Sequence, residues 1–208
     1  MPELPEVETS RRGIEPFLVG ERIDKIQIRE PRLRWPVQAD VARNLSGQEI
    51  DSVTRRAKYL LINTANGSAM IHLGMSGSVY IVDQGTPAAV HEHFDFELGS
   101  GKMLRYRDPR RFGSLHWTDN PEQHKLLKSL GPEPLGDDFS GAYLRRRAKG
   151  RSVNVKQFIM NANVVVGVGN IYASEALFLA GINPRRAAGR IAQTRYDRLA
   201  EVIREVLQ

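Results

Sequence analysis

The chain has 208 residues, of which 41% are hydrophobic, and its 30 lysines and arginines outnumber its 24 aspartates and glutamates, a net charge of +6. This apolar content allows one sizeable core or two small ones. No apolar run is long enough to span a membrane, so we expect a soluble protein without a membrane partner. Without cysteine, disulfides and thiolate zinc sites are excluded within these residues. The sequence opens without a signal-peptide hydrophobic region, which predicts a cytoplasmic location.

The chain starts with Met1, Pro2 and Glu3. An initiator methionine before a small residue is commonly removed, which would leave Pro2 as a free secondary amine beside a carboxylate. A terminal amine has a pKa of about 8 and is partly neutral near pH 7. Because the amine of proline is secondary, its attack on an aldehyde gives an iminium that is cationic at any pH, an electron sink for elimination. The pair therefore predicts covalent catalysis. If Met1 is retained, Pro2 is an amide and cannot attack, and the alternative interpretation is that Pro2 only marks the start site.

A helix is predicted from Pro5, with apolar residues on one face at Leu4, Val7, Ile14 and Phe17. From about Glu21 to Trp117 the pattern changes to short apolar or alternating runs bounded by Gly, Asn, Asp and Pro, which predicts an antiparallel β-sandwich or flattened barrel. The expected strands are 23–28, 59–62, 69–73, 79–82, 94–98 and 103–106.

Residues 131–141 fit neither period and are predicted to link residues 1–130 to a helical domain over 142–208. In this domain one helix should start near Asn170 and stop at Gly181. The next should begin at Thr194, with Asp197 completing a capping-box variant, and its apolar face comprises Tyr196, Leu199, Ile203 and Val206. Its pattern reaches Gln208 without a stop signal, so we expect the polypeptide to have been cut or to be incomplete. The predicted class is α+β.

Two basic clusters suit a phosphate backbone, although each could equally be a solvated face. The first comprises Arg105, Arg107, Arg110 and Arg111, and the second comprises Arg145, Arg146, Arg147, Lys149 and Arg151. His91 and His93 have the spacing of one strand face, but without a third ligand we interpret them as structural residues and predict no metal site.

Five motifs in order carry a family resemblance: residues 1–9 (MPELPEVET), 56–60 (RAKYL), 72–77 (HLGMSG), 108–113 (DPRRFG) and 166–175 (VGVGNIYASE). Together the sequence resembles the bacterial formamidopyrimidine-DNA glycosylases. The resemblance implies a β-sandwich followed by a helix-two-turn-helix domain, and a monomer acting on double-stranded DNA that contains oxidised purines or abasic sites. The implied activity is base excision through a Schiff base on Pro2, followed by strand cleavage through β,δ-elimination.

The resemblance also implies the site residues. Pro2 is the nucleophile, Glu3 the acid and base, and Glu6 either orients the amine or is a carboxylate favoured by the helix dipole. Lys58 reaches a phosphate flanking the lesion, and further phosphate contacts are expected from His72, Lys156 and Asn170. A flipped nucleotide leaves a gap, which the family fills with Met75, Arg110 and Phe112. The turn composition around Met75 predicts that its side chain is exposed.

Family members normally continue into a zinc finger, which would lie beyond Gln208, so no cofactor is expected within this chain. Because that finger supplies a phosphate contact, we expect the 208 residues alone to bind DNA weakly and excise little base. The alternatives are a non-catalytic DNA-binding fragment, the sister endonuclease for oxidised pyrimidines, and an unrelated small-molecule enzyme with a proline base, such as a tautomerase.

Overall fold

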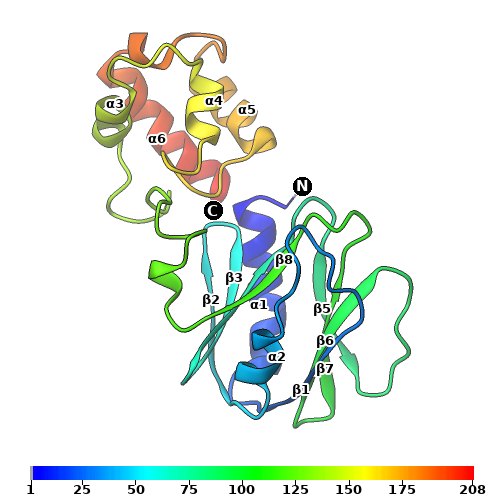
Figure 1. The fold of residues 1–208 in the computed structure, drawn as a ribbon. Helices are drawn as coiled ribbons and strands as arrows, with labels where there is room; N and C mark the ends of the chain where they lie inside the picture. The colour runs from blue at the N-terminus through cyan, green and yellow to red at the C-terminus, as the bar shows by residue number, and fades with distance from the viewer. Residues whose placement is uncertain (1) are drawn as a thin grey trace. The chain divides into compact units, whose positions relative to one another are not determined.

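The computed structural model describes residues 2–208, and the predicted removal of Met1 lies outside the described residues. The chain divides into two compact units. The sandwich unit comprises Pro2 and residues 6–128, and the helical unit comprises residues 3–5 together with residues 129–208. Figure 1 shows the strands in one part of the chain and four of the helices in the other. The predicted α+β class is confirmed.

The sandwich unit holds two antiparallel sheets of four strands each, in the orders β1-β6-β7-β5 and β2-β3-β4-β8. Helix α1 precedes them and α2 follows β1 (Figure 1). The elements are α1 (Leu4–Leu18), β1 (Ile23–Ile28), α2 (Asp40–Leu45), β2 (Ile50–Arg56), β3 (Tyr59–Thr64), β4 (Gly67–His72), β5 (Ser78–Asp83), β6 (Glu92–Leu98), β7 (Lys102–Arg107), β8 (Ser114–Thr118) and the short 3-10 helix η1 (Pro121–Gln123).

The core of this unit lies between α1, α2 and the inward faces of both sheets, and it includes Phe94 stacked on Tyr106. Val7, Ile14 and Leu18 of α1 are buried in it, whereas Phe17, predicted on the same face, is 47% exposed. Ile14 follows Val7 by seven residues and Leu18 follows Ile14 by four, which places these three side chains on one apolar face of the helix; Phe17 lies outside this face. The prediction for Phe17 was therefore wrong.

The helical unit contains α3 (Gly141–Ala148), α4 (Val155–Met160), α5 (Asn170–Leu179), the 3-10 helix η2 (Ala188–Arg190) and α6 (Gln193–Leu207). Its core collects Phe139, Leu144, Phe158 and the buried face of α6. The predicted limits of α5 are confirmed: it begins at Asn170, and Gly181 follows it with a left-handed φ of +64°.

The predicted capping box of α6 is wrong. The helix begins at Gln193, its N-cap is Ala192 without a side-chain cap bond, and Asp197 accepts a hydrogen bond from the Gln193 side chain at 2.7 Å instead. Tyr196, Leu199 and Ile203 are buried as predicted.

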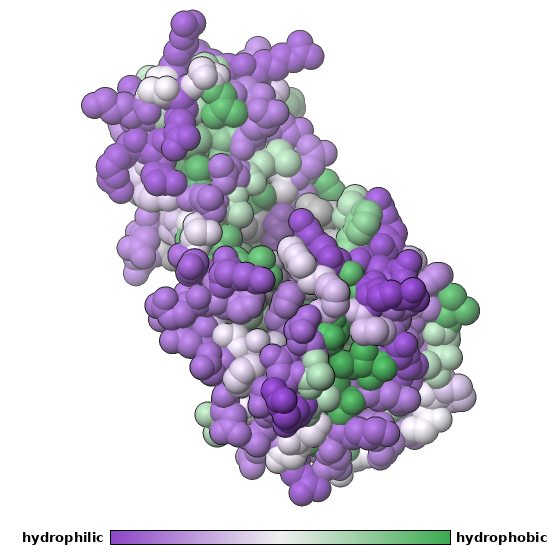
Figure 2. Space-filling model, viewed as in Figure 1, coloured by the Kyte–Doolittle hydropathy of each residue, from purple (hydrophilic) through white to green (hydrophobic). Residues whose placement is uncertain are grey.

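Figure 2 shows hydrophilic side chains over most of the visible face. Across residues 2–208, every helix falls short of the length and apolarity that a bilayer crossing requires.

Candidate active site

The carboxylate of Glu3 caps the start of α5. Its side chain is 1% exposed and accepts hydrogen bonds from the backbone N–H groups of Gly169 (2.6 Å), Ile171 (2.9 Å) and Tyr172 (3.4 Å). The next residue along, Leu4, donates its N–H to the carbonyl of Gly167 at 3.1 Å. A helix N-terminus has unpaired N–H groups and favours negative charge. The residue after Pro2 is thus held at one fixed place within the helical unit.

Two glycines make room for this contact. A Cβ atom on Gly169 would lie 2.3 Å from the carboxyl carbon of Glu3, and one on Gly167, whose φ is +83°, would lie 2.5 Å from Leu4 Cδ1. These three N–H groups bind Glu3 and are therefore not available to the phosphate that is predicted to contact Asn170. Asn170 itself is exposed and Lys156 is half-buried on α4.

Two carboxylates in the first turns of α1, those of Glu6 and Glu8, have different surroundings. Glu6 is exposed. Glu8, which the sequence did not single out, pairs with Arg11 at 3.0 Å and with Arg55 of β2 at 3.2 Å. Burial alone would raise the pKa of Glu8, but hydrogen bonds from these arginines and from Arg12 lower it. Glu8 therefore ties α1 to the second sheet as a stable anion.

Lys58 lies in a two-residue turn between β2 and β3. The turn is tight because Ala57 has a left-handed φ of +55°. The turn places Lys58 directly before Tyr59, which pairs with His72 across the sheet, and the rings of Tyr59 and His72 lie 4.8 Å apart.

His72 ends β4. Burial, with the positive charges of Lys58 and Arg34, lowers the pKa of His72 to about 4. Its Nδ1 accepts a hydrogen bond from the N–H of Gly74 at 3.0 Å. The neutral ring therefore carries its proton on Nε2, and it can offer that N–H to an anion without adding charge.

Two turns of the sandwich unit border one open groove of about 770 Å³. Met75 is 42% exposed, which confirms the exposure predicted from the turn composition, and Phe112 is 43% exposed. The guanidinium of Arg110 lies 4.8 Å from the centre of the Phe112 ring, a cation–π contact. The groove is lined by Arg32, Leu33, Arg34, His72, Gly74, Met75, Arg110, Arg111 and Phe112. It thus brings together the three predicted gap-filling residues and one predicted phosphate contact.

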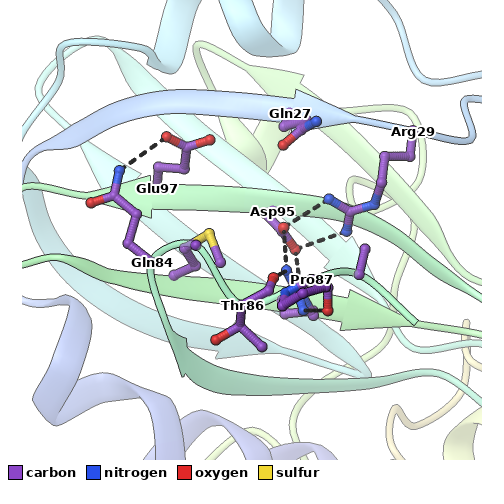
Figure 3. A pocket seen from close by; sticks show the side chains of 11 residues that line it. Gln27, Arg29, Gln84, Thr86, Pro87, Asp95 and Glu97 are labelled. Atoms are coloured by element: carbon purple, nitrogen blue, oxygen red, sulfur yellow. Dashed lines mark hydrogen bonds and ion pairs between the residues drawn. The ribbon is translucent and has the colours of Figure 1, made fainter.

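The first predicted phosphate-binding cluster is not one surface. Arg105 is 2% exposed and pairs with Asp95 at 2.9 Å and with Glu92 at 3.1 Å. It also donates to the carbonyls of Thr86 and Pro87, which line the same pocket as Asp95 (Figure 3). Arg29 completes the group with two hydrogen bonds to Asp95. In this pocket of about 430 Å³ the charges of Arg29, Asp95 and Arg105 are thus paired with each other, and Arg105 is a structural residue.

His91 and His93 do not share a strand face as predicted. His91 precedes β6 with a left-handed φ of +73°, whereas His93 is buried and its Nε2 lies 2.7 Å from the carbonyl oxygen of Asp108. The structural role predicted for His93 is confirmed. Within residues 2–208, no three His, Asp or Glu side chains are grouped as metal ligands.

In the second basic cluster, Arg147 donates to the carbonyl of Asn163 at 3.0 Å, and the guanidinium of Arg146 lies 5.6 Å from the Tyr143 ring. The sequence contains no Asp or Glu between Asp138 and Glu175. This part of the helical unit is consequently positive.

Comparisons with known proteins agree with this geometry. Residues 1–115 match the family model of the formamidopyrimidine-DNA glycosylase N-terminal domain, and residues 130–208 match that of its H2TH domain. The chain is 61% identical to the formamidopyrimidine-DNA glycosylase of Stutzerimonas stutzeri and 56% identical to that of Stenotrophomonas maltophilia, in each case over all of this chain and 77% of the relative.

Solved structures give the same result. The Lactococcus lactis formamidopyrimidine-DNA glycosylase, bound non-covalently to DNA with an abasic site, superposes with a TM-score of 0.92 at 31% identity, covering 99% of this chain and 80% of that one. The complex of the Lactococcus lactis enzyme with DNA containing a formamidopyrimidine-dG gives 0.91 at 32% identity, covering 99% and 78%.

Proposed function

The chain belongs to the formamidopyrimidine-DNA glycosylase family, a family of base excision repair enzymes, and we propose that it excises oxidised purines through Pro2 and then cleaves the strand. The observation that carries the proposal is the clamped carboxylate of Glu3. It fixes the position of the residue bonded to Pro2, so nucleophile and proton carrier approach the same sugar together. Damaged double-stranded DNA is the proposed partner, as in the solved relatives.

In the proposed reaction the nitrogen of Pro2 bonds to C1′, and the glycosidic bond breaks as the base leaves with a proton. The sugar ring then opens: the C1′–O4′ bond breaks, O4′ takes a proton, and the nitrogen becomes doubly bonded to C1′ as an iminium. The iminium draws electrons from C2′, a proton is lost there, and the bond from C3′ to its phosphate oxygen breaks. Glu3 carries protons to and from the sugar. A second elimination releases the 5′ phosphate. Glu6 would orient the amine or hold a water.

We assign the remaining residues to holding the DNA. Lys58, His72, Lys156 and Asn170 contact phosphates flanking the damaged nucleotide, and Met75, Arg110 and Phe112 occupy the gap that it leaves. Exposure of Met75 and Phe112 at one groove supports the second assignment. We further propose that the protein acts as a monomer in the bacterial cytoplasm.

Borohydride trapping tests the proposal. With a duplex that carries a preformed abasic site, the chain should form a stable cross-link once intact mass shows that Met1 is absent, because only an iminium is reduced to an adduct. Pro2→Ala should trap at least about tenfold more slowly. The iminium of a primary amine can lose its proton near pH 7 and become a neutral imine, whereas the iminium of a secondary amine has no such proton and stays cationic. DNA binding without any cross-link would indicate a non-catalytic fragment instead. Comparing duplexes with 8-oxoguanine and with an oxidised pyrimidine separates the purine enzyme from its sister endonuclease.

A further inference from the structure

Asp108 connects the two turns that border the groove. It is fully buried, and its two carboxylate oxygens accept four hydrogen bonds. Oδ1 accepts from the Ser76 hydroxyl at 2.6 Å and from the Arg110 N–H at 3.2 Å, and Oδ2 accepts from the Gly113 N–H at 2.8 Å and from the Tyr106 hydroxyl at 3.1 Å. Ser76 follows Met75 in one turn, and Arg110 and Gly113 bracket Phe112 in the other.

The backbone of Asp108 is fixed as firmly as its side chain. Its N–H donates to the carbonyl of His91 at 2.9 Å, and its carbonyl oxygen lies 2.7 Å from His93 Nε2. These contacts come from the residues before and within β6. The backbone of Asp108 is therefore bound to the start of β6, while its carboxylate binds both turns.

The turns also pack on each other without space for side chains. A Cβ on Gly74, next to Met75, would lie 2.4 Å from the carbonyl carbon of Phe112. The Tyr106 hydroxyl sits behind both turns, because a Cβ on Gly113 would lie 1.8 Å from it and one on Gly77 would lie 2.8 Å away. A shift of one turn is consequently transmitted to the other.

We propose that Asp108 is a positioning residue that makes the Met75 turn and the Arg110–Phe112 turn enter the duplex as one rigid wedge. This inference rests on the proposed function. It assigns no DNA contact to Asp108 itself. Separating base steps costs free energy at each step. If the two turns moved independently, binding would also cost the conformational entropy that both turns lose when they become ordered. A preformed wedge is already ordered before it binds and avoids that cost.

The test compares an abasic site in a duplex with the same site in a single strand, since only the duplex has to be opened. Ser76→Ala removes both hydrogen bonds of the Ser76 hydroxyl, the one it donates to Asp108 and the one it accepts from the Arg110 N–H at 3.3 Å, and leaves the other three bonds of Asp108 in place. Asp108→Asn is the stronger variant, because an amide nitrogen cannot accept a hydrogen bond. Ser78→Ala, at an exposed serine of β5, is the matched control. Borohydride trapping measures the chemistry, and 2-aminopurine opposite the abasic site reports insertion by its fluorescence.

We expect Ser76→Ala and Asp108→Asn to slow duplex trapping by about tenfold, the usual effect of losing a hydrogen bond to a charged group. Single-strand trapping should stay within about twofold of wild type, and the 2-aminopurine signal should fall. A chain with both Ser76→Ala and Met75→Ala should be no slower than one with Met75→Ala alone, because the two changes disable the same wedge.

Unchanged duplex trapping by Ser76→Ala, or equal losses on duplex and single strand, would overturn the inference and leave the proposed function standing. Strictly additive effects of Ser76→Ala and Met75→Ala would overturn it too. A wild-type chain that traps neither substrate would refute the proposed function, and the inference with it. Because Ser76→Ala leaves the core intact, a failure of Asp108→Asn to fold does not weaken the test.

Discussion

At the scale of single residues, the contact between Glu3 and Gly169 gives the first prediction. In Gly169→Ala the new methyl group would lie 2.3 Å from the carboxyl carbon of Glu3, so the carboxylate must leave the start of α5. We expect trapping on an abasic duplex to fall at least about tenfold, as in Glu3→Gln, with a loss of stability of about 1–3 kcal/mol. Trapping and urea unfolding measure the two effects.

Gly13→Ala is the control for that change. Gly13 lies within α1, and a Cβ there meets nothing within 4 Å. An alanine should raise the free energy of unfolding by roughly 0.5–1 kcal/mol, because glycine is unfavourable inside helices, and should leave trapping unchanged. If Gly169→Ala behaved like Gly13→Ala, the clamp on Glu3 would have no role in the reaction.

His72 gives a pH prediction. Its pKa is about 4 in the folded chain and about 6.5 when unfolded, so between these values the unfolded chain binds the extra proton. Stability contributed by the neutral ring is therefore complete above pH 6.5 and is lost as the pH falls toward 4. One pKa unit corresponds to about 1.4 kcal/mol, and for this half-buried ring we expect a loss of about 1–2 kcal/mol.

Urea unfolding at pH 7.5 and pH 5 measures this loss. His72→Gln, which cannot titrate, should reduce the difference between the two pH values. His116, whose pKa burial and His124 also lower to about 4, should retain its own share in that variant. An equally steep pH dependence with and without His72 would show that its ring is freely protonated in the folded chain.

Local residue patterns predicted some of the site and could not predict the rest. The exposure of Met75 followed from the glycines and serine beside it, because turn chemistry is local. The capping of α5 by Glu3 joins residues 166 positions apart, and no period in the sequence carries that information. Arg105 was assigned to phosphate because it stands among other arginines, but its partner Asp95 lies on the neighbouring strand. The roles of the site residues in catalysis and DNA binding stay predictions.

At the scale of elements, we predict that the stability of the first sheet depends on the pairing of Asp95 with two arginines. Burial alone would raise the pKa of Asp95, but hydrogen bonds from Arg29 and Arg105 lower it. Asp95→Asn would leave both guanidinium groups without their main partner beneath the loop around Thr86. We expect unfolding to become easier by about 3–5 kcal/mol, the usual cost of breaking a buried pair from one side.

Glu97→Gln on the same strand is the control. Its carboxylate is 3.9 Å from Lys25, whose side chain is 63% exposed, and such a surface pair contributes at most about 1 kcal/mol. Urea unfolding followed by tryptophan fluorescence compares the two variants. Similar midpoints for both would mean that the Asp95 group is as well hydrated as the surface pair.

The same sheets show which elements the sequence pattern could predict. The six expected strands are present, with ends that differ by up to two residues. Strands β2 and β8 and helix α2 were missed. In β2 only Ile50 and Val53 are buried, three positions apart, so the alternation that marks a strand is absent. Helix α2 has six residues, too few for a helical period to emerge. These elements are defined by their neighbours.

At the scale of the whole molecule, one helix contributes to two separate cores. Leu4 is buried with the helical unit, whereas Val7, Ile14 and Leu18 are buried with the sandwich unit. The helical period and the strand alternation could both be recognised in the sequence. Neither of them indicated that the boundary between the two units falls inside α1. Substitutions one turn apart in this helix should therefore weaken different units.

Leu4→Ala and Val7→Ala test this division, because the two units have different spectroscopic signals. Both tryptophans, Trp35 and Trp117, belong to the sandwich unit, so fluorescence follows that unit, while circular dichroism at 222 nm mainly follows the helices. Removing a buried leucine or valine side chain costs roughly 2–5 kcal/mol. Leu4→Ala should lower the urea midpoint measured by circular dichroism more than that measured by fluorescence, and Val7→Ala should do the reverse. If each variant moved both midpoints equally, the cores would unfold as one, and the loss at Leu4 would be transmitted along α1 to the sheets.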